Sequence, residues 1–279
     1  MILVELRKLF RRPRTWATIA ALNALPLVVA VLLVLTNLAP RPGQGPAFLS
    51  AVLHNGALFP LAALAIVLPL FLPIAVAVVA GDSVAGEAQA GTLRYLLARP
   101  AGRTRLLVAK LVAVLAFVVV TVLVVAGVGY LIGVTLFEVA PPSVTTIAGP
   151  PTSGTSVSGT ALTTAELGQR SLMAIGYIAV SMLGVAAFAL FFSTLTDSPL
   201  GATMGALAVL VASSLLFTLN AASPIAPYLP TRYWLAFVDL FRDPIHWRDV
   251  LRGLGLQAVY VGVLLTAAWA NFTTKDITS

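Results

Sequence analysis

The side chains that most often carry out chemistry are scarce in this chain of 279 residues. It has no cysteine, which excludes a disulfide framework, a thiolate metal site and a cysteine nucleophile. The two histidines, His54 and His246, lie far apart without a Glu-x-x-His partner, so metal catalysis is not expected. None of the three lysines stands in the phosphate-cradling pattern GxxxxGKS or GxxxxGKT. The chain is therefore not expected to be an enzyme, and any use of ATP would need a second polypeptide.

The most polar stretch of the chain is residues 86–110. It carries five cations and a single acid, Glu87, and reads GEAQAGTLRYLLARPAGRTRLLVAK. Each cation at the centre of a bilayer costs about 2.5–3.5 kcal/mol, so five together would oppose insertion by roughly 12–17 kcal/mol. We therefore expect a cytoplasmic loop outside the hydrocarbon, containing a short helix whose first turn holds Glu87, where a carboxylate complements the helix dipole.

The leucines of this loop suggest what it touches. Leu93, Leu96 and Leu97 would share one face of the short helix, and that face could enter an apolar groove of a partner. The alternative is a helix that rests on the lipid surface, with Arg94 and Arg99 on headgroups.

The elements that position this loop are predicted to be membrane helices. The chain is 59% hydrophobic and 10% charged, whereas a soluble domain is nearer a quarter charged. The sequence contains six long runs without charged residues, and each is long enough for the roughly 20 residues of a spanning helix. We therefore predict an all-α membrane protein with a single transmembrane domain, 1–279. The six predicted spans are residues 16–38, 58–80, 111–137, 172–192, 200–219 and 253–270. None contains Asp, Glu, Lys or Arg, which disfavours ion-coupled transport.

Three further segments connect or flank the spans. Residues 1–14 are predicted to form an amphipathic helix in the headgroup plane. Residues 138–170, rich in Pro, Ser, Thr and Gly, are predicted to be an external linker. Residues 220–252 should form one or two short external helices, interfacial or partly re-entrant, whose aromatic side chains act either as an external gate or simply as membrane anchors. The aromatic residues in question are Tyr228, Tyr233, Trp234, Phe237 and Phe241.

The distribution of basic residues predicts the orientation. Eleven Lys and Arg residues precede the first span, lie in residues 86–110 or follow the last span, against six on the other side. The positive-inside rule then places both termini in the cytoplasm. The net charge of +7 reports this orientation, and no basic and aromatic nucleic-acid module is recognisable.

The polar stretch also carries a family resemblance. Gly86-Glu87, Gly91-Thr92-Leu93, Leu96-Leu97, Pro100, Arg103 and Lys110 resemble the cytoplasmic signature of ABC-2 type transporter permeases. In that family the signature follows the second span and forms a coupling helix docked on a separate ATPase subunit. The resemblance assigns ATPase coupling to Glu87, Gly91, Thr92, Leu93, Arg94, Leu96, Leu97, Arg99 and Arg103. The chain departs from the pattern at Gln89 and Ala90, where relatives often carry acids, which leaves the polar contacts to the ATPase open.

The resemblance implies the membrane subunit of an ATP-driven exporter in a bacterial plasma membrane. The chain itself would hold no cofactor, because ATP and Mg would be bound by the ABC ATPase subunit. A second permease copy would complete the pathway, and Gly201 and Gly205 could allow close helix packing. The apolar spans favour an amphipathic or lipid-like substrate. The alternatives are a non-transporting membrane scaffold or assembly factor and, less favoured, an intramembrane enzyme.

Overall fold

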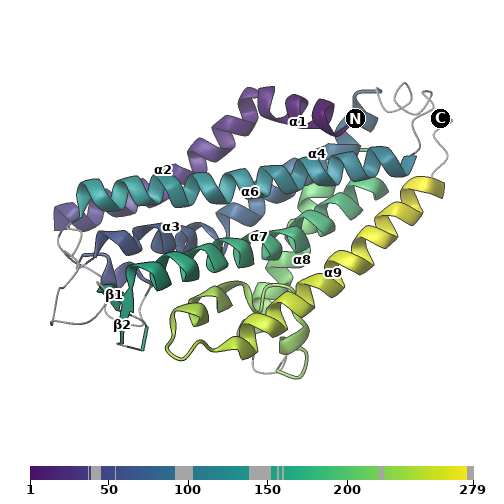
Figure 1. The fold of residues 1–279 in the computed structure, drawn as a ribbon. Helices are drawn as coiled ribbons and strands as arrows, with labels where there is room; N and C mark the ends of the chain where they lie inside the picture. The colour runs from purple at the N-terminus through teal and green to yellow at the C-terminus, as the bar shows by residue number, and fades with distance from the viewer. Residues whose placement is uncertain are drawn as a thin grey trace.

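The chain folds into a bundle of long helices, with short helical and strand segments at one end (Figure 1). The structure is a computed structural model that describes residues 1–36, 38, 45–53, 55–91, 103–137, 152–155, 157–158, 160–219 and 223–274. Its α-helices are α1 (Ile2–Arg11), α2 (Pro13–Thr36), α3 (Phe59–Val67), α4 (Phe71–Gln89), α6 (Arg103–Leu136), α7 (Thr164–Leu195), α8 (Pro199–Thr218) and α9 (Trp247–Thr274). Six of them, α2, α4, α6, α7, α8 and α9, are long and apolar enough to cross a membrane. The coarse prediction of a mostly helical chain with several such helices is confirmed.

Proline sets two of the breaks between helices. Arg12 is extended, as expected for a residue that precedes proline, and Pro13 then opens α2. The predicted span 58–80 is wrong as one helix, because it is divided into α3 and α4 by a turn at residues 68–70. Pro69 lies in that turn, where it can donate no backbone hydrogen bond.

Five of the spanning candidates, α2, α4, α6, α7 and α9, extend beyond the predicted spans at one or both ends and include charged residues there, whereas α8 nearly coincides with the predicted span 200–219 and has none. α4 continues through Asp82 and Glu87 to Gln89, and α6 begins at Arg103. With 34 residues, α6 is about 50 Å long, well beyond a hydrocarbon core of roughly 30 Å. α7 starts early because Thr163 and Glu166 form a reciprocal capping box.

The helices alternate in direction, which brings distant segments of the chain to the same end. The start of α1, the facing ends of α4 and α6, the α7–α8 turn and the end of α9 lie at one end, on the right in Figure 1. We call this the N-terminal end of the bundle. α7 lies centrally and packs against α4, α6, α8 and α9.

Glycines allow one especially close helix contact inside the chain. A Cβ added to Gly133 of α6 would overlap the backbone oxygen of Gly56, and one added to Gly129 would press on Pro60. The Gly-x3-Gly pair of α6 therefore serves packing against α3 and the preceding turn η2 (Gly56–Leu58).

The opposite end holds two departures from the predictions. A small antiparallel hairpin, β1 (Thr152–Thr155) paired with β2 (Ala161–Thr163), means that the chain is not strictly all-α. The aromatic segment forms η4 (Ala226–Tyr228) and η5 (Trp234–Phe241). Its side chains at Tyr233, Trp234, Phe237 and Phe241 are buried in the protein, so they are core residues and not an exposed aromatic belt. Only Tyr228 of the proposed gate is largely exposed, at 69%.

Candidate functional site

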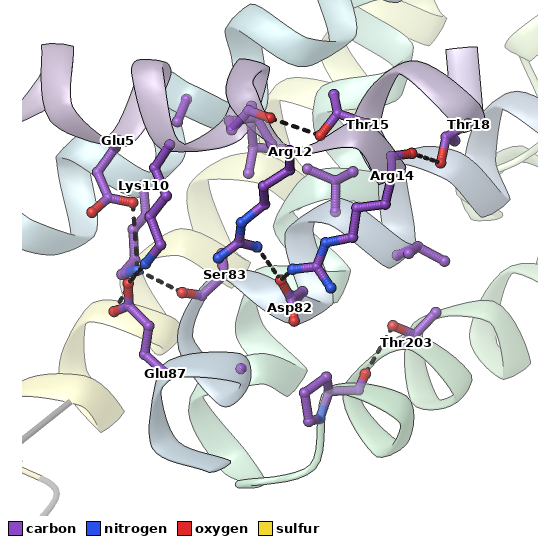
Figure 2. A pocket seen from close by; sticks show the side chains of 18 of the residues that line it. Glu5, Arg12, Arg14, Thr15, Thr18, Asp82, Ser83, Glu87, Lys110 and Thr203 are labelled. Carbon is purple, nitrogen blue, oxygen red and sulfur yellow. Dashed lines mark hydrogen bonds and ion pairs between the residues drawn. The ribbon is translucent and has the colours of Figure 1, made fainter. Parts of the chain in front are cut away.

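A cavity of about 400 Å³ opens at the N-terminal end of the bundle, between α1, α2, α4, α6 and α8 (Figure 2). One wall is polar and charged, and the other is apolar. The polar wall consists of Glu5, Lys8, Arg12, Arg14, Thr15, Thr18, Asp82, Ser83, Glu87, Lys110 and Thr203. The apolar wall includes Leu9, Val78, Val79, Ala113, Val114, Leu200 and Met204. Two groups of ion pairs organise the polar wall.

The first group is centred on Glu87 and Lys110. Lys110 Nζ lies 2.7 Å from Glu87 Oε2 and donates to the carbonyl oxygen of Ser83 at 2.6 Å. Lys8 of α1 donates to Glu87 Oε1 at 2.5 Å, and Glu5 adds a longer contact to Lys110 at 3.7 Å. Lys110 is only 2% exposed and Glu87 only 5%, so each charge depends on its partners for compensation. This group therefore ties α1, α4 and α6 together.

The position predicted for Glu87 is wrong. We expected it at the start of a short helix, but it lies in the last turn of α4. The negative end of the helix dipole is there, so the helix does not stabilise the carboxylate. The two lysines supply that stabilisation instead, from α1 and α6.

The second group joins two arginines to one carboxylate, as Figure 2 shows. Arg12 Nη1 donates to Asp82 Oδ2 at 2.8 Å, and Arg14 Nη2 donates to the same oxygen at 2.5 Å. Arg12 lies in the link between α1 and α2, and Arg14 lies in the first turn of α2. Two guanidinium groups therefore share a single carboxylate oxygen at the mouth of the cavity.

Hydroxyl groups fix α4 against its neighbours just below the charges. Ser193 Oγ of α7 donates to the carbonyl oxygen of Gly81 at 2.7 Å and accepts from the backbone N–H groups of Val84 and Ala85. On the other side, a Cβ at Gly81 would collide with Thr203 of α8. Sequence reasoning missed Ser193, because nothing in its spacing distinguishes it from the other serines of the helices.

The C-terminal part of the polar stretch, which forms the start of α6, is attached to α9. Arg103, the first residue of α6, donates to the carbonyl oxygens of Thr273 at 2.9 Å and Phe272 at 3.4 Å. The indole N–H of Trp269 donates to Thr104 Oγ1 at 2.9 Å. The two bonds from Arg103 satisfy carbonyl groups at the C-terminal end of α9, and the Trp269 bond adds a side-chain contact between α9 and α6. Arg103, predicted to be a coupling residue, thus has a role within the chain.

Several other predicted coupling residues cannot be placed. Thr92, Leu93, Arg94, Leu96, Leu97 and Arg99 lie outside the described residues. Gly91 follows the end of α4 with a positive φ of 67°, a conformation that favours glycine. The predicted coupling site is therefore described at its two ends, where α4 and α6 are held together.

The proposed external gate lies at the opposite end and is anchored by tyrosine and glutamine side chains. Tyr177 of α7 donates to the carbonyl oxygen of Tyr233 at 2.6 Å, and Tyr260 of α9 donates to that of Tyr228 at 2.7 Å. Gln257 of α9 donates to the carbonyl oxygen of Pro230 at 2.8 Å. The segment is thus fixed to α7 and α9, and the C-terminal ends of both helices lie at the N-terminal end of the bundle (Figure 1).

The glycines proposed for helix packing differ from each other. A Cβ at Gly205 would press on the ring of Phe192, so Gly205 serves the contact between α7 and α8 inside the chain. A Cβ at Gly201 would lie at ordinary contact distances of 3.5–3.6 Å from Ser198 and Thr196, which precede α8. In the part of the chain that the structure describes, no three His, Asp or Glu side chains gather as a metal site would require.

Comparison with known proteins assigns the chain to a family. It belongs to the family described as "Protein of unknown function (DUF2705)", which matches residues 27–278. The match includes Asp82, Glu87 and Lys110 but begins after the basic residues of α1 and the α1–α2 link. No curated protein matches the chain.

Proposed function

We propose that the chain is the membrane subunit of an ABC-2 type exporter, energised by a separate ATPase subunit and working with a second permease copy. The observation that carries the proposal is the construction of the α4–α6 pair. The two helices are joined by the Glu87–Lys110 ion pair, and the segment between them holds the leucines and arginines of the family-like signature. A segment attached at both ends to a fixed base, here the joined ends of α4 and α6, is what a coupling element requires.

The contacts of that base define a route by which force could spread. Glu87 and Lys110 would carry displacement of the 92–102 segment into α4 and α6. Ser193 connects α4 with α7, and Arg103 connects α6 with α9. α7 and α9 in turn hold the external segment through the hydrogen bonds from Tyr177 and Gln257. In this proposal a movement at the ATPase side reaches the opposite end through two long helices.

The substrate class follows from the composition of the helices. The six candidate spanning helices are strongly apolar, and their charges gather near helix ends. Such walls offer no fixed charge in the middle of a pathway to bind a small ion, which would be costly to bury there. We therefore propose an amphipathic or lipid-like substrate, exported from a bacterial plasma membrane with both termini of the chain in the cytoplasm.

Copurification tests the proposal. A tagged chain expressed with its native neighbours should retain an ATPase chain in about a one-to-one ratio, measured by quantitative mass spectrometry. Leu93→Asp with Leu96→Asp should abolish this binding, because two carboxylates cannot enter an apolar groove without a large desolvation cost.

Val157→Asp is the matched control, because Val157 is an exposed apolar residue near the β1–β2 hairpin at the opposite end. It should retain the ATPase fully. If the double variant remained folded and still bound the ATPase normally, the coupling assignment would be refuted.

A further inference from the structure

We infer that the cavity at the N-terminal end of the bundle is a binding site for an anionic phospholipid, with the phosphodiester on Arg12 and Arg14 and an acyl chain along α4 and α8. The inference goes beyond the transport proposal and does not need an ATPase. It depends on the charges, the layering and the exposure of the cavity walls.

Among the described residues that line the cavity, the basic side chains outnumber the acidic ones by one. Lys8 and Lys110 are matched by Glu5 and Glu87, which contact them directly. Arg12 and Arg14 share the single carboxylate of Asp82. Each guanidinium carries five N–H donors, so the two arginines have ten, and their bonds to the one oxygen of Asp82 use few of these donors. One phosphodiester would supply the missing negative charge and further acceptor oxygens, and arginine forks suit phosphate geometry.

The walls are layered as a lipid would require. One helical turn from Asp82 towards the interior of the bundle, α4 presents Val78, and one turn beyond Leu200, α8 presents Met204. Thr18 stands one turn beyond Arg14 on α2. The charged groups therefore lie at one level, and the side chains about 6 Å deeper are uncharged: Val78 and Met204 are apolar, and Thr18 carries only a hydroxyl. A free phosphate ion would use only the upper layer.

The cavity is also accessible from the side. Val78, Leu200 and Met204 line it and are nevertheless among the exposed apolar residues, as is the side chain of Arg14, at 62%. Exposed apolar walls next to a partly exposed guanidinium suit a ligand that enters from surrounding lipid. An acyl chain would cover the apolar wall while its headgroup stays at the polar rim.

Substitution of Asp82 tests the inference sharply, because the inference and its alternative predict opposite changes in lipid affinity. Its carboxylate accepts from both arginines and would therefore compete with a phosphodiester for them. Asp82→Asn keeps the size of the side chain and removes the competing charge, so it should tighten phosphatidylglycerol binding. Were Asp82 only a structural partner of the arginines, its loss would disorder them and weaken binding.

Lipid binding to the purified full chain, measured by native mass spectrometry, provides the test. Phosphatidylglycerol should bind in preference to phosphatidylcholine. Arg12→Gln with Arg14→Gln should weaken phosphatidylglycerol binding about tenfold or more, the equivalent of losing a charge-assisted contact. The matched control is Arg7→Gln with Arg11→Gln, which removes the same charge from α1 outside the cavity and should change affinity less than about twofold.

Three results would overturn the inference. The first is equal affinity for phosphatidylcholine and phosphatidylglycerol. The second is a loss of phosphatidylglycerol affinity in the Arg7 and Arg11 control equal to that in the Arg12 and Arg14 variant. The third is weaker phosphatidylglycerol binding by a folded Asp82→Asn variant. Inorganic phosphate serves as the competing probe: displacement of the lipid at similar concentrations would be a fourth such result and would assign the site to free phosphate instead. Because the chain alone is measured, failure here would leave the ATPase proposal untouched, and loss of ATPase binding would leave this site untouched.

Discussion

At the scale of single residues, the account depends on a buried lysine. Lys110 is almost fully enclosed: its Nζ donates to the carbonyl oxygen of Ser83 and forms ion pairs with Glu87 at 2.7 Å and with Glu5 at 3.7 Å. Burial of a charge is tolerated only where partners replace its water. Removing one member of a buried pair is strongly destabilising, because it leaves the other charge uncompensated. The pair therefore fixes the register of α4 against α6 more than it adds stability.

Breaking a buried ion pair typically costs about 3–5 kcal/mol. Lys110→Met should lower the free energy of unfolding by an amount near the lower end of that range, because Lys8 still pairs with Glu87. Thermal or denaturant unfolding in detergent measures the change. Lys8→Met, which removes a side chain that is 40% exposed, should cost about 1 kcal/mol or less.

With the single variant Glu87→Gln measured as well, the double variant Lys110→Met with Glu87→Gln completes the cycle. It should be more stable than Lys110→Met alone, because no buried carboxylate then lacks its main partner. Additive losses would show that the two side chains are not coupled as described.

At the scale of elements, close packing of α6 against α3 and η2 depends on the missing side chains of Gly56 and Gly133. Gly133→Ala should reduce the free energy of unfolding by about 1–3 kcal/mol, since backbone atoms would have to separate. Gly127→Ala in the same helix is the control, because its Cβ would meet nothing within 4 Å. It should be neutral or slightly stabilising, by up to about 1 kcal/mol. Equal effects of the two changes on the unfolding midpoint would contradict the packing described.

Charge-free runs in the sequence located the long helices, but they placed the ends poorly. Helices continue through ionised residues where side chains can pair, as α4 does through Asp82 and Glu87. The capping box at Thr163 and Glu166 was present in the sequence and would have extended α7 correctly. The sequence also carries a signal for the break at Pro69, because Pro60, Pro69 and Pro73 all fall within the predicted span 58–80 and proline disrupts a helix interior.

The candidate site was harder to predict than the helices. Lys8 and Glu87 lie 79 positions apart, and Arg12 and Asp82 lie 70 apart, so no local pattern pairs them. The aromatic segment at Trp234–Phe241 was ambiguous for another reason. Helical spacing of large apolar residues is the same whether the face meets lipid or protein, and here it meets protein.

At the scale of the whole molecule, the helix directions group the start of α1, the α4–α6 junction and the end of α9 at one end (Figure 1). That grouping agrees with the side on which basic residues accumulate. In membranes, the side richer in Lys and Arg faces the cytoplasm. The hairpin β1–β2 lies at the opposite end and should therefore face outwards.

Single cysteines can test this orientation, because the native chain contains none. A membrane-impermeant maleimide applied to intact cells should label Ser153→Cys. It should label Ala101→Cys and Ser279→Cys only after the membrane is permeabilised. The unmodified chain provides the background. Labelling of Ala101→Cys in intact cells would reverse the orientation and remove the segment from reach of a cytoplasmic ATPase.

The central claim is that the chain receives its energy from another polypeptide. The most direct measurement is movement of a fluorescent amphipathic lipid analogue in proteoliposomes, made with the chain alone or with its copurified ATPase. We predict movement only when both the ATPase and ATP are present, and none with the chain alone under an imposed proton or sodium gradient. Translocation by the chain alone, driven by an ion gradient without nucleotide, would contradict the account.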